Sequence, residues 1–149
     1  MPEDNREMPE LVPAENSAES APETEPTDAN GWFERGVKSA MLGFPDKAAA
    51  DFQEAAWLDP DNAKIHFNMG TAHLSMGMFE QALVNFNRAI ELSPDMSDAI
   101  GNRAVAYTAL GQDQLAEEDV AKAVSLGAPP DGLGAVIDYV KTQRVARKT

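Results

Sequence analysis

The chain has 149 residues, 25 acidic against 12 basic side chains, a formal net charge of −13 and no cysteine. This length suits one ordinary domain, and the lack of cysteine excludes disulfides, thiolate metal sites and cysteine nucleophiles. The acidic balance argues against nucleic acid as a partner, because binding the phosphate backbone usually needs a basic face. No stretch approaches the roughly 18 uninterrupted apolar residues of a membrane-spanning helix.

The N-terminal region, residues 1–28, differs in composition from the rest of the chain. It holds nine acidic residues, one arginine, five prolines and no aromatic residue. Such a segment cannot bury enough apolar surface to offset the entropy cost of ordering it, so we predict a disordered, solubilising acidic tail. A second interpretation is an arm that shields a basic or apolar patch. The region also lacks the positive start and apolar run of a signal peptide, and we therefore expect a soluble, cytoplasmic protein.

From Ala29 onward the sequence repeats itself every 34 residues. The segments FQEAAWLDP and FNRAIELSP, for example, begin at Phe52 and Phe86. Further matching columns are Gly36/Gly70/Ala104, Gly43/Gly77/Gly111, Ala48/Ala82/Ala116, Phe52/Phe86/Val120, Ala55/Ala89/Ala123 and Leu58/Leu92/Leu126. A fixed period of this size is typical of a stacked array in which no single unit can bury its own apolar face. We predict three repeats, at 29–62, 63–96 and 97–130.

Each repeat has the pattern of two helices joined by a tight turn. In the second copy, small and apolar residues recur three and four positions apart in Ala63–Met76 and again in Phe79–Leu92. Gly77 tolerates the left-handed conformation with which a helix often ends. Pro94 follows the second helix, which it cannot continue because it has no N–H group.

The segment after Pro129 and Pro130, residues 131–149, predicts a seventh helix. Its apolar residues fall on one stripe, formed by Leu133, Val136, Ile137 and Val140. Its C-terminal end is basic and carries Lys141, Arg144, Arg147 and Lys148. We expect this helix to cap the array, because the last unit of an array leaves an apolar face uncovered. The alternative is a basic amphipathic helix that makes a second contact with a partner or an anionic membrane.

The repeat pattern resembles the tetratricopeptide repeat. That repeat has characteristic positions for a large residue, Gly, Ala, Phe, Ala and Pro. The first copy fills them with Trp32, Gly36, Ala48, Phe52, Ala55 and Pro60. The resemblance covers about residues 29–130 and implies an all-α solenoid of three helix-turn-helix repeats plus the capping helix. Arg35 and Arg103 depart from it by occupying a usually apolar column, and we expect their stems to pack while their charged heads reach solvent.

The sequence predicts no enzyme, no cofactor and no metal site. His66 and His73 are seven residues apart on one helix, roughly 10.5 Å, which is too far for both to bind one ion. Both stand in columns that other copies fill with packing residues. The run Glu117–Asp119 lies on a helix and is expected to be a solvated face, not a catalytic pair.

In tetratricopeptide arrays the first helices of successive repeats line a concave groove that binds peptides, and the resemblance implies the same here. The groove positions would be Asn30, Phe33, Val37, Lys64, Phe67, Asn68, Thr71, Asp98, Gly101, Asn102, Val105 and Thr108. Among these, the aromatic residues and Val105 can supply apolar anchor pockets. Asn68 and Asn102 can each pair with both the N–H and the C=O of an extended backbone.

Some members of this family hold the acidic C-terminus of heat-shock chaperones with a two-carboxylate clamp of Lys, Asn and Arg. The matching positions here are Phe33, Val37, Asn68, Asp98 and Asn102. Only Asn68 fits that pattern, and Asp98 would repel a carboxylate. We therefore expect a different kind of ligand.

The sequence predicts a non-catalytic protein–protein interaction module that binds a peptide or partner segment, as an adaptor or an assembly subunit. A holdase or secretion-type chaperone that keeps a client segment soluble is the alternative. A third possibility is that the groove is filled by the chain's own acidic tail or capping helix.

Overall fold

The computed structural model describes residues 24–149. Most of the predicted acidic tail, residues 1–23, lies outside this part of the chain. Residues 24–27 have no regular secondary structure, and the Asp28 side chain then caps the first helix by accepting a hydrogen bond from the Gly31 N–H at 2.7 Å.

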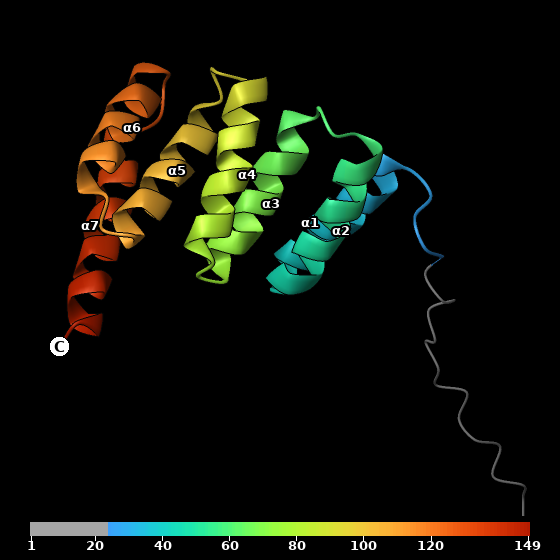
Figure 1. The fold of residues 1–149 in the computed structure, drawn as a ribbon, viewed down its shortest axis with the longest axis horizontal. Helices are drawn as coiled ribbons and strands as arrows, with labels where there is room; N and C mark the ends of the chain where they lie inside the picture. The colour runs from blue at the N-terminus through green and yellow to red at the C-terminus, as the bar shows by residue number, and fades with distance from the viewer. Residues whose placement is uncertain (1–23) are drawn as a thin grey trace, which may run out of the picture.

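Over residues 24–149 the chain forms seven helices and no strand. They are α1 (Ala29–Met41), α2 (Pro45–Leu58), α3 (Ala63–Ser75), α4 (Phe79–Leu92), α5 (Ser97–Ala109), α6 (Asp113–Ser125) and α7 (Pro130–Arg147). The pairs α1–α2, α3–α4 and α5–α6 stack side by side in chain order, with α7 at the far end from α1 (Figure 1). The predicted all-α solenoid is confirmed, and none of these helices is long and apolar enough to cross a membrane.

The turns inside the three pairs are alike. Gly43, Gly77 and Gly111 have φ values of +83°, +72° and +78°, a left-handed conformation that glycine adopts without steric cost. This confirms the role predicted for Gly77. All three turns lie along one edge of the array (Figure 1).

The first two repeats close their helix pairs with the same contact between a glycine and a phenylalanine. A Cβ atom on Gly36 would lie 2.7 Å from Cε1 of Phe52, and one on Gly70 would lie 2.7 Å from Cε1 of Phe86. Both phenylalanines are fully buried. The missing Cβ therefore makes room for the ring, so each pair of columns works as one packing unit.

The arginines of the first and third repeats are partly exposed, with side chains 34% and 22% exposed, but their charged heads bind aspartates, a partner that the prediction lacked. Arg35 binds Asp51 through two hydrogen bonds of 2.8 and 3.0 Å, and Arg103 binds Asp119 through two of 2.7 Å. The hydrogen bonds that Arg103 donates to Asp119 are the main reason that the pKa of Arg103 is raised. Both carboxylates are buried, with side chains only 8% and 9% exposed, and a buried carboxylate needs a cationic partner.

The second repeat replaces both partners of this ion pair at once. Met69 stands in the arginine column and is buried, while Asn85 stands in the aspartate column. The Asn85 side-chain oxygen instead lies 2.7 Å from Nδ1 of His73. The two columns thus change together, and no buried charge is left without a partner.

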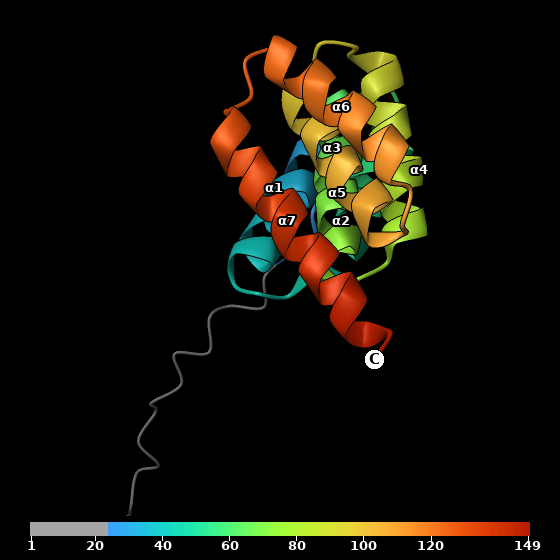
Figure 2. The same ribbon diagram turned by 90° about the vertical axis from the view of Figure 1, so that its left-hand side faces the viewer.

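The capping helix α7 rests mainly on α5, with a smaller contact to α6. Leu133 lies over Gly101, where a Cβ atom would be 3.7 Å from the leucine methyl groups, and Ile137 is buried beside Ala104. Between the earlier repeats, by contrast, α3 contacts mainly α2 and α5 contacts mainly α4, the second helices of the preceding repeats. Figure 2 shows α7 crossing the end of the stack at a slant.

A charged contact fixes the C-terminal half of α7. The Arg144 guanidinium donates to both carboxylate oxygens of Asp113, at 2.6 and 3.0 Å, and to the Thr108 carbonyl oxygen at 2.7 Å. These hydrogen bonds lower the pKa of Asp113 and raise the pKa of Arg144. The Thr108 carbonyl, near the C-terminal end of α5, also accepts from the Gly111 N–H at 3.1 Å, so Arg144 adds a second donor to it.

Candidate peptide-binding groove

The groove residues predicted from the sequence lie on α1, α3 and α5. Two contacts join residues on neighbouring first helices. The Lys64 ammonium group lies 5.4 Å from the centre of the Phe33 ring, and the Asn102 amide donates to the Thr71 hydroxyl at 3.3 Å. The structure therefore brings Phe33 close to Lys64, and Thr71 close to Asn102.

The two predicted aromatic anchors are only partly available to a ligand. Phe33 packs against Phe52 with ring centres 5.6 Å apart, and Phe67 packs against Phe86 at 6.2 Å. Both are half-buried, so one side of each ring belongs to the core and the other side faces outward. Val37 is likewise half-buried against the first core cluster.

The two amides of the groove are each held by one hydrogen bond from their nitrogen. The Asn68 amide nitrogen donates to the Lys64 carbonyl at 2.8 Å, and the Asn102 amide nitrogen donates to Thr71. Thr71 in turn donates its hydroxyl to the Phe67 carbonyl at 3.0 Å. Each amide keeps its carbonyl oxygen and one N–H for a ligand. The prediction that each amide can pair with both the N–H and the C=O of a peptide backbone therefore stays a prediction.

The third repeat does not offer an open groove in this arrangement. Thr108 is completely buried, and its hydroxyl donates to the Ala104 carbonyl at 2.8 Å. Gly101 is buried, and Val105 packs into the cluster that includes Leu133 and Ile137 of α7. The prediction that Thr108 lines the groove is wrong, because the capping helix covers this stretch of α5.

The open end of the groove lies at the N-termini of α1 and α3. A cavity of about 500 Å³ is lined there by Asp28, Ala29, Asn30, Phe33, Asp59, Asn62, Lys64 and Ile65. Its charged groups are two carboxylates and one ammonium group. Asn30 donates to Glu34 at 2.9 Å, and the exposed Asp98 adds a further negative charge in the first turn of α5. The groove is thus apolar and acceptor-rich, with a single lysine.

The model of the tetratricopeptide repeat matches residues 63–96, the second repeat. Solved structures share the arrangement of helices. The second tetratricopeptide domain of Spaghetti (RPAP3), bound to the HSP90 peptide SRMEEVD, is 26% identical with a TM-score of 0.66, covering 67% of this chain and 93% of that one. The second repeat thus matches the tetratricopeptide repeat, and the helices of the chain are arranged as in solved tetratricopeptide domains.

Two further structures extend this comparison. The first RPAP3 domain, bound to the same peptide, is 23% identical with a TM-score of 0.71, covering 80% of this chain and 94% of that one. The Arabidopsis OM64 tetratricopeptide domain is 21% identical with a TM-score of 0.70, covering 77% and 95%. At these identities the likeness concerns the fold alone. No curated protein sequence matches the chain.

The two histidines have structural partners within the array. Nε2 of His66 lies 2.7 Å from the Pro60 carbonyl oxygen, while His73 contacts Asn85. Within residues 24–149 no three His, Asp or Glu residues lie together in a way that could hold a metal ion.

Proposed function

We propose that the protein is a non-catalytic adaptor or assembly subunit of the cytoplasm that binds an extended protein segment along α1, α3 and the start of α5. The observation that carries the proposal is the pair of half-buried phenylalanines beside amide carbonyl oxygens on consecutive first helices. Apolar pockets next to backbone-reading groups are what an extended peptide requires for affinity and register. The RPAP3 domains, which share the fold, are bound to a peptide, and this supports a peptide segment as the class of ligand.

The ligand we expect is poor in carboxylates. Phe33 and Val37 replace cationic or amide groups of a carboxylate clamp, and Asp98 adds a negative charge. The peptide SRMEEVD therefore serves as a discriminating probe. Like-charge contacts can cost several kcal/mol, so its dissociation constant should be at least ~100-fold weaker than that of the natural segment. Tight binding of SRMEEVD would contradict this ligand class.

The groove can be tested with a partner segment found by crosslinking mass spectrometry of the endogenous protein. Asn68→Leu and Asn102→Ala each remove one acceptor, and each should weaken binding roughly tenfold, as expected for one hydrogen bond of about 1.4 kcal/mol. Gln53→Ala and Gln81→Ala, on the exposed faces of α2 and α4, are matched controls that should leave the dissociation constant unchanged. Calorimetry with the synthetic segment measures all four. Crosslinks confined to α2, α4 and α6 would reject the groove as the binding face.

A holdase function is favoured by a second observation. The turn between α1 and α2 exposes Met41, Leu42 and Phe44, with side chains 83%, 63% and 47% exposed. Exposed apolar residues gathered in one turn can cover an apolar client segment. Co-expression separates the two functions, because a holdase should raise the soluble yield of its partner and lose this effect in Leu42→Asp. An adaptor should bind a partner that is soluble without it.

A further inference from the structure

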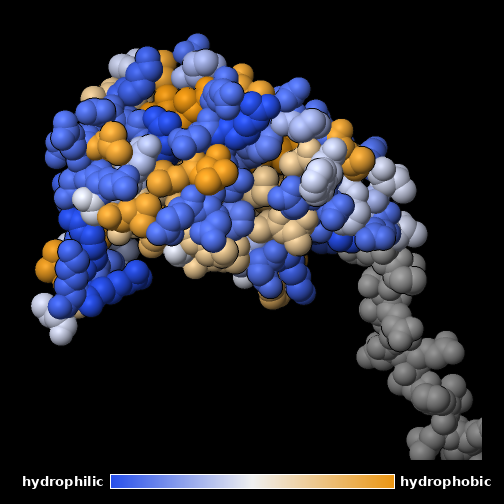
Figure 3. Space-filling model, viewed as in Figure 1, coloured by the Kyte–Doolittle hydropathy of each residue, from blue (hydrophilic) through white to orange (hydrophobic). Residues whose placement is uncertain are grey.

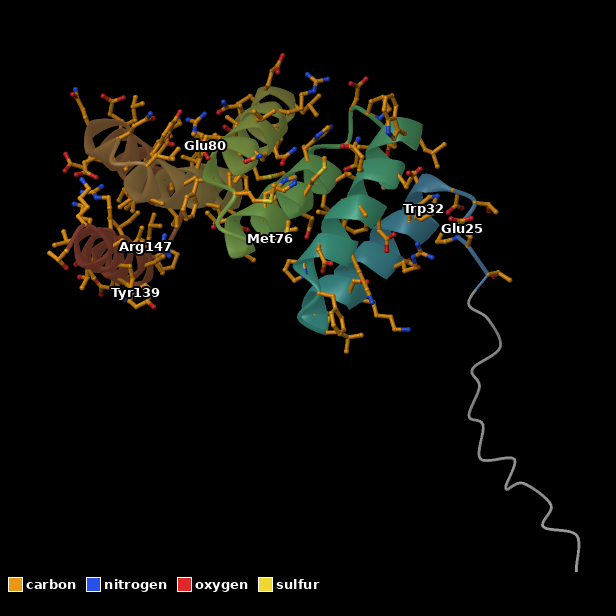
Figure 4. The ribbon with its side chains drawn as sticks, turned by 60° about the horizontal axis from the view of Figure 1, so that its bottom comes forward. Glu25, Trp32, Met76, Glu80, Tyr139 and Arg147 are labelled. Carbon is orange, nitrogen blue, oxygen red and sulfur yellow. The ribbon has the colours of Figure 1, made fainter. Side chains whose placement is uncertain are left out.

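A second hollow lies at the opposite end of the molecule from the groove's open end. Its volume is about 340 Å³, and it lies between the C-terminal half of α7, the start of α4 and the end of α5. Phe79, Ala109 and Val140 give it apolar walls, and Arg147 and Lys148 add positive charge. The end of α7 projects beyond the rest of the array here (Figure 3). Tyr139 and Arg147, both on α7, are labelled in Figure 4.

The charges at this hollow are available to a ligand. Arg144 is fixed by Asp113 and Thr108, so it serves the fold. Arg147 and Lys148 are exposed, and no salt bridge joins either of them to a residue in 24–149, although the Lys148 charge contributes to the lowered pKa of Asp113. Tyr139 is 65% exposed. The hollow thus combines apolar walls with two unpaired cations, in a chain whose net charge is −13.

This chemistry is complementary to one segment of the same chain. Residues 1–23 contain seven acidic residues and one arginine, a net charge of 1 − 7 = −6. Within them the sequence EMPELVPAE, Glu7–Glu15, places Met8, Leu11 and Val12 between carboxylates. The groove is a poor alternative for this segment, because its open end carries Asp28 and Asp59 against a single lysine.

We propose that the hollow at the end of α7 is a docking site for the acidic segment Glu7–Glu15 of the same molecule. The side chains of Met8 and Leu11 pack against Phe79 and Val140. The carboxylates of the segment face Arg147 and Lys148, an arrangement in which unlike charges meet at the edge of an apolar contact. The acidic N-terminal region is then an arm that covers a basic, apolar site.

The length of the chain allows this contact within one molecule. Met8 lies 16 residues before Thr24, and an extended chain spans at most about 3.3–3.6 Å per residue, about 55 Å in all. Across the array, the path from Thr24 to the hollow takes three steps between successive first helices, from α1 to α3, α5 and then α7. At about 10 Å per step this is roughly 30 Å. It is also about one helix length away along the helices, about 20 Å. The direct distance is then roughly 35–40 Å, well within reach.

The full-length protein offers a direct test because it contains no cysteine. A nitroxide spin label attached at Ser17→Cys, close to the segment but outside it, broadens the NMR signals of nearby amides. We expect loss of the amide signals of Tyr139, Gln143 and Arg147, with recovery when the label is reduced. We also expect recovery at about 1 M salt, where charges are screened beyond about 3 Å. Loss of the signals of Phe33 and Phe67 instead would place the segment in the groove and overturn the proposal.

Two pairs of substitutions make the test specific. Met8→Ser with Leu11→Ser changes only the proposed ligand, outside residues 24–149, and should restore the α7 signals. Arg147→Glu with Lys148→Glu should do the same, whereas Lys47→Glu with Lys122→Glu, an equal change in net charge, should leave the broadening intact. Broadening that survives both test pairs would overturn the proposal. So would broadening that appears on unlabelled molecules mixed with labelled ones, because it would place the segment on a second copy.

Discussion

The first two repeats and the third repeat solve the same packing problem in different ways. In the first two, a glycine accepts the ring of a buried phenylalanine, as in Gly70 and Phe86. In the third, Ala104 and Val120 share the same volume, and α7 covers the side of α5 that is open in α1 and α3. The difference teaches that an array can end by turning a binding face into a packing face. The ligand site and the end of the array therefore compete for the same helix surface.

The largest difference between these regions should appear when their buried side chains are shortened. Phe86→Ala removes a fully buried ring and should lower the free energy of unfolding by about 3–5 kcal/mol. Val120→Ala removes two carbons from a half-buried side chain and should cost about 1–2 kcal/mol. Urea denaturation followed by circular dichroism measures both. Equal losses would show that the third repeat depends on its larger residue as much as the second does.

The packing units themselves can be exchanged between repeats. Gly70→Ala places a Cβ 2.7 Å from the Phe86 ring and should destabilise the protein. Overpacking should cost up to about 3 kcal/mol, and the higher helix propensity of alanine should offset about 1 kcal/mol of this. In the Phe86→Val background the same change copies the third repeat, and it should stabilise by about 1 kcal/mol. The sign change, measured as a double-mutant cycle, tests whether the two columns act together. A Gly70→Ala effect of the same sign in both backgrounds would argue against coupling.

The buried ion pair of the third repeat can likewise be exchanged for the uncharged residues that the second repeat has in the same columns. Arg103→Met alone leaves the buried Asp119 carboxylate without its partner, and it should cost about 1–3 kcal/mol. Adding Asp119→Asn recreates the Met69–Asn85 combination of the second repeat. Replacing both partners of a buried pair can be close to neutral, so the double variant should unfold within about 1 kcal/mol of the wild type. A double variant as unstable as Arg103→Met would contradict this account.

Much of the fold could be predicted from the sequence because three copies report on the same columns. The turn glycines, the buried phenylalanines and the helix-ending prolines recur at a fixed spacing, and each has a local physical reason. The pairing of Arg35 with Asp51 did not follow from either column alone. The sequence does contain its signal, because both columns are charged in the first and third repeats and both are uncharged in the second. Only a comparison of the two columns reveals the ion pair.

The candidate site was less predictable from the sequence. Family geometry placed the groove on the first helices, but whether a residue there is accessible depends on elements elsewhere in the chain. Thr108 shows this most clearly, because it is completely buried, whereas Leu74 and Ala40, in the same column of the second and first repeats, are half-buried and exposed. The slant of α7, which decides the burial of Thr108, arises from Leu133 over Gly101 and from Arg144, contacts that no repeat column encodes.

The smallest expected effect concerns the attachment of α7, which separates the covered third repeat from the open ones. Because hydrogen bonds from Arg144 lower the pKa of Asp113, this carboxylate stabilises the docked helix above the ordinary aspartate pKa of about 3.9. The contribution is lost as pH falls below about 4, through the lowered pKa. Amide exchange of α7, followed by mass spectrometry at several pH values, should therefore accelerate relative to α3 as the solution is acidified.

Asp113→Asn isolates this contribution from the titration of other carboxylates. The variant should exchange faster in α7 at neutral pH, and its α7 exchange relative to α3 should no longer depend on pH near 4. Asp46→Asn, in the first turn of α2, is the matched control for the loss of an acidic residue at a helix N-terminus, and it should leave α7 unchanged. If α7 in Asp113→Asn keeps the protection and pH response of the wild type, its position depends on Leu133 and Ile137 alone. Apolar packing alone would then hold α7 over the third repeat, and the contact between Arg144 and Asp113 would add no stability to it.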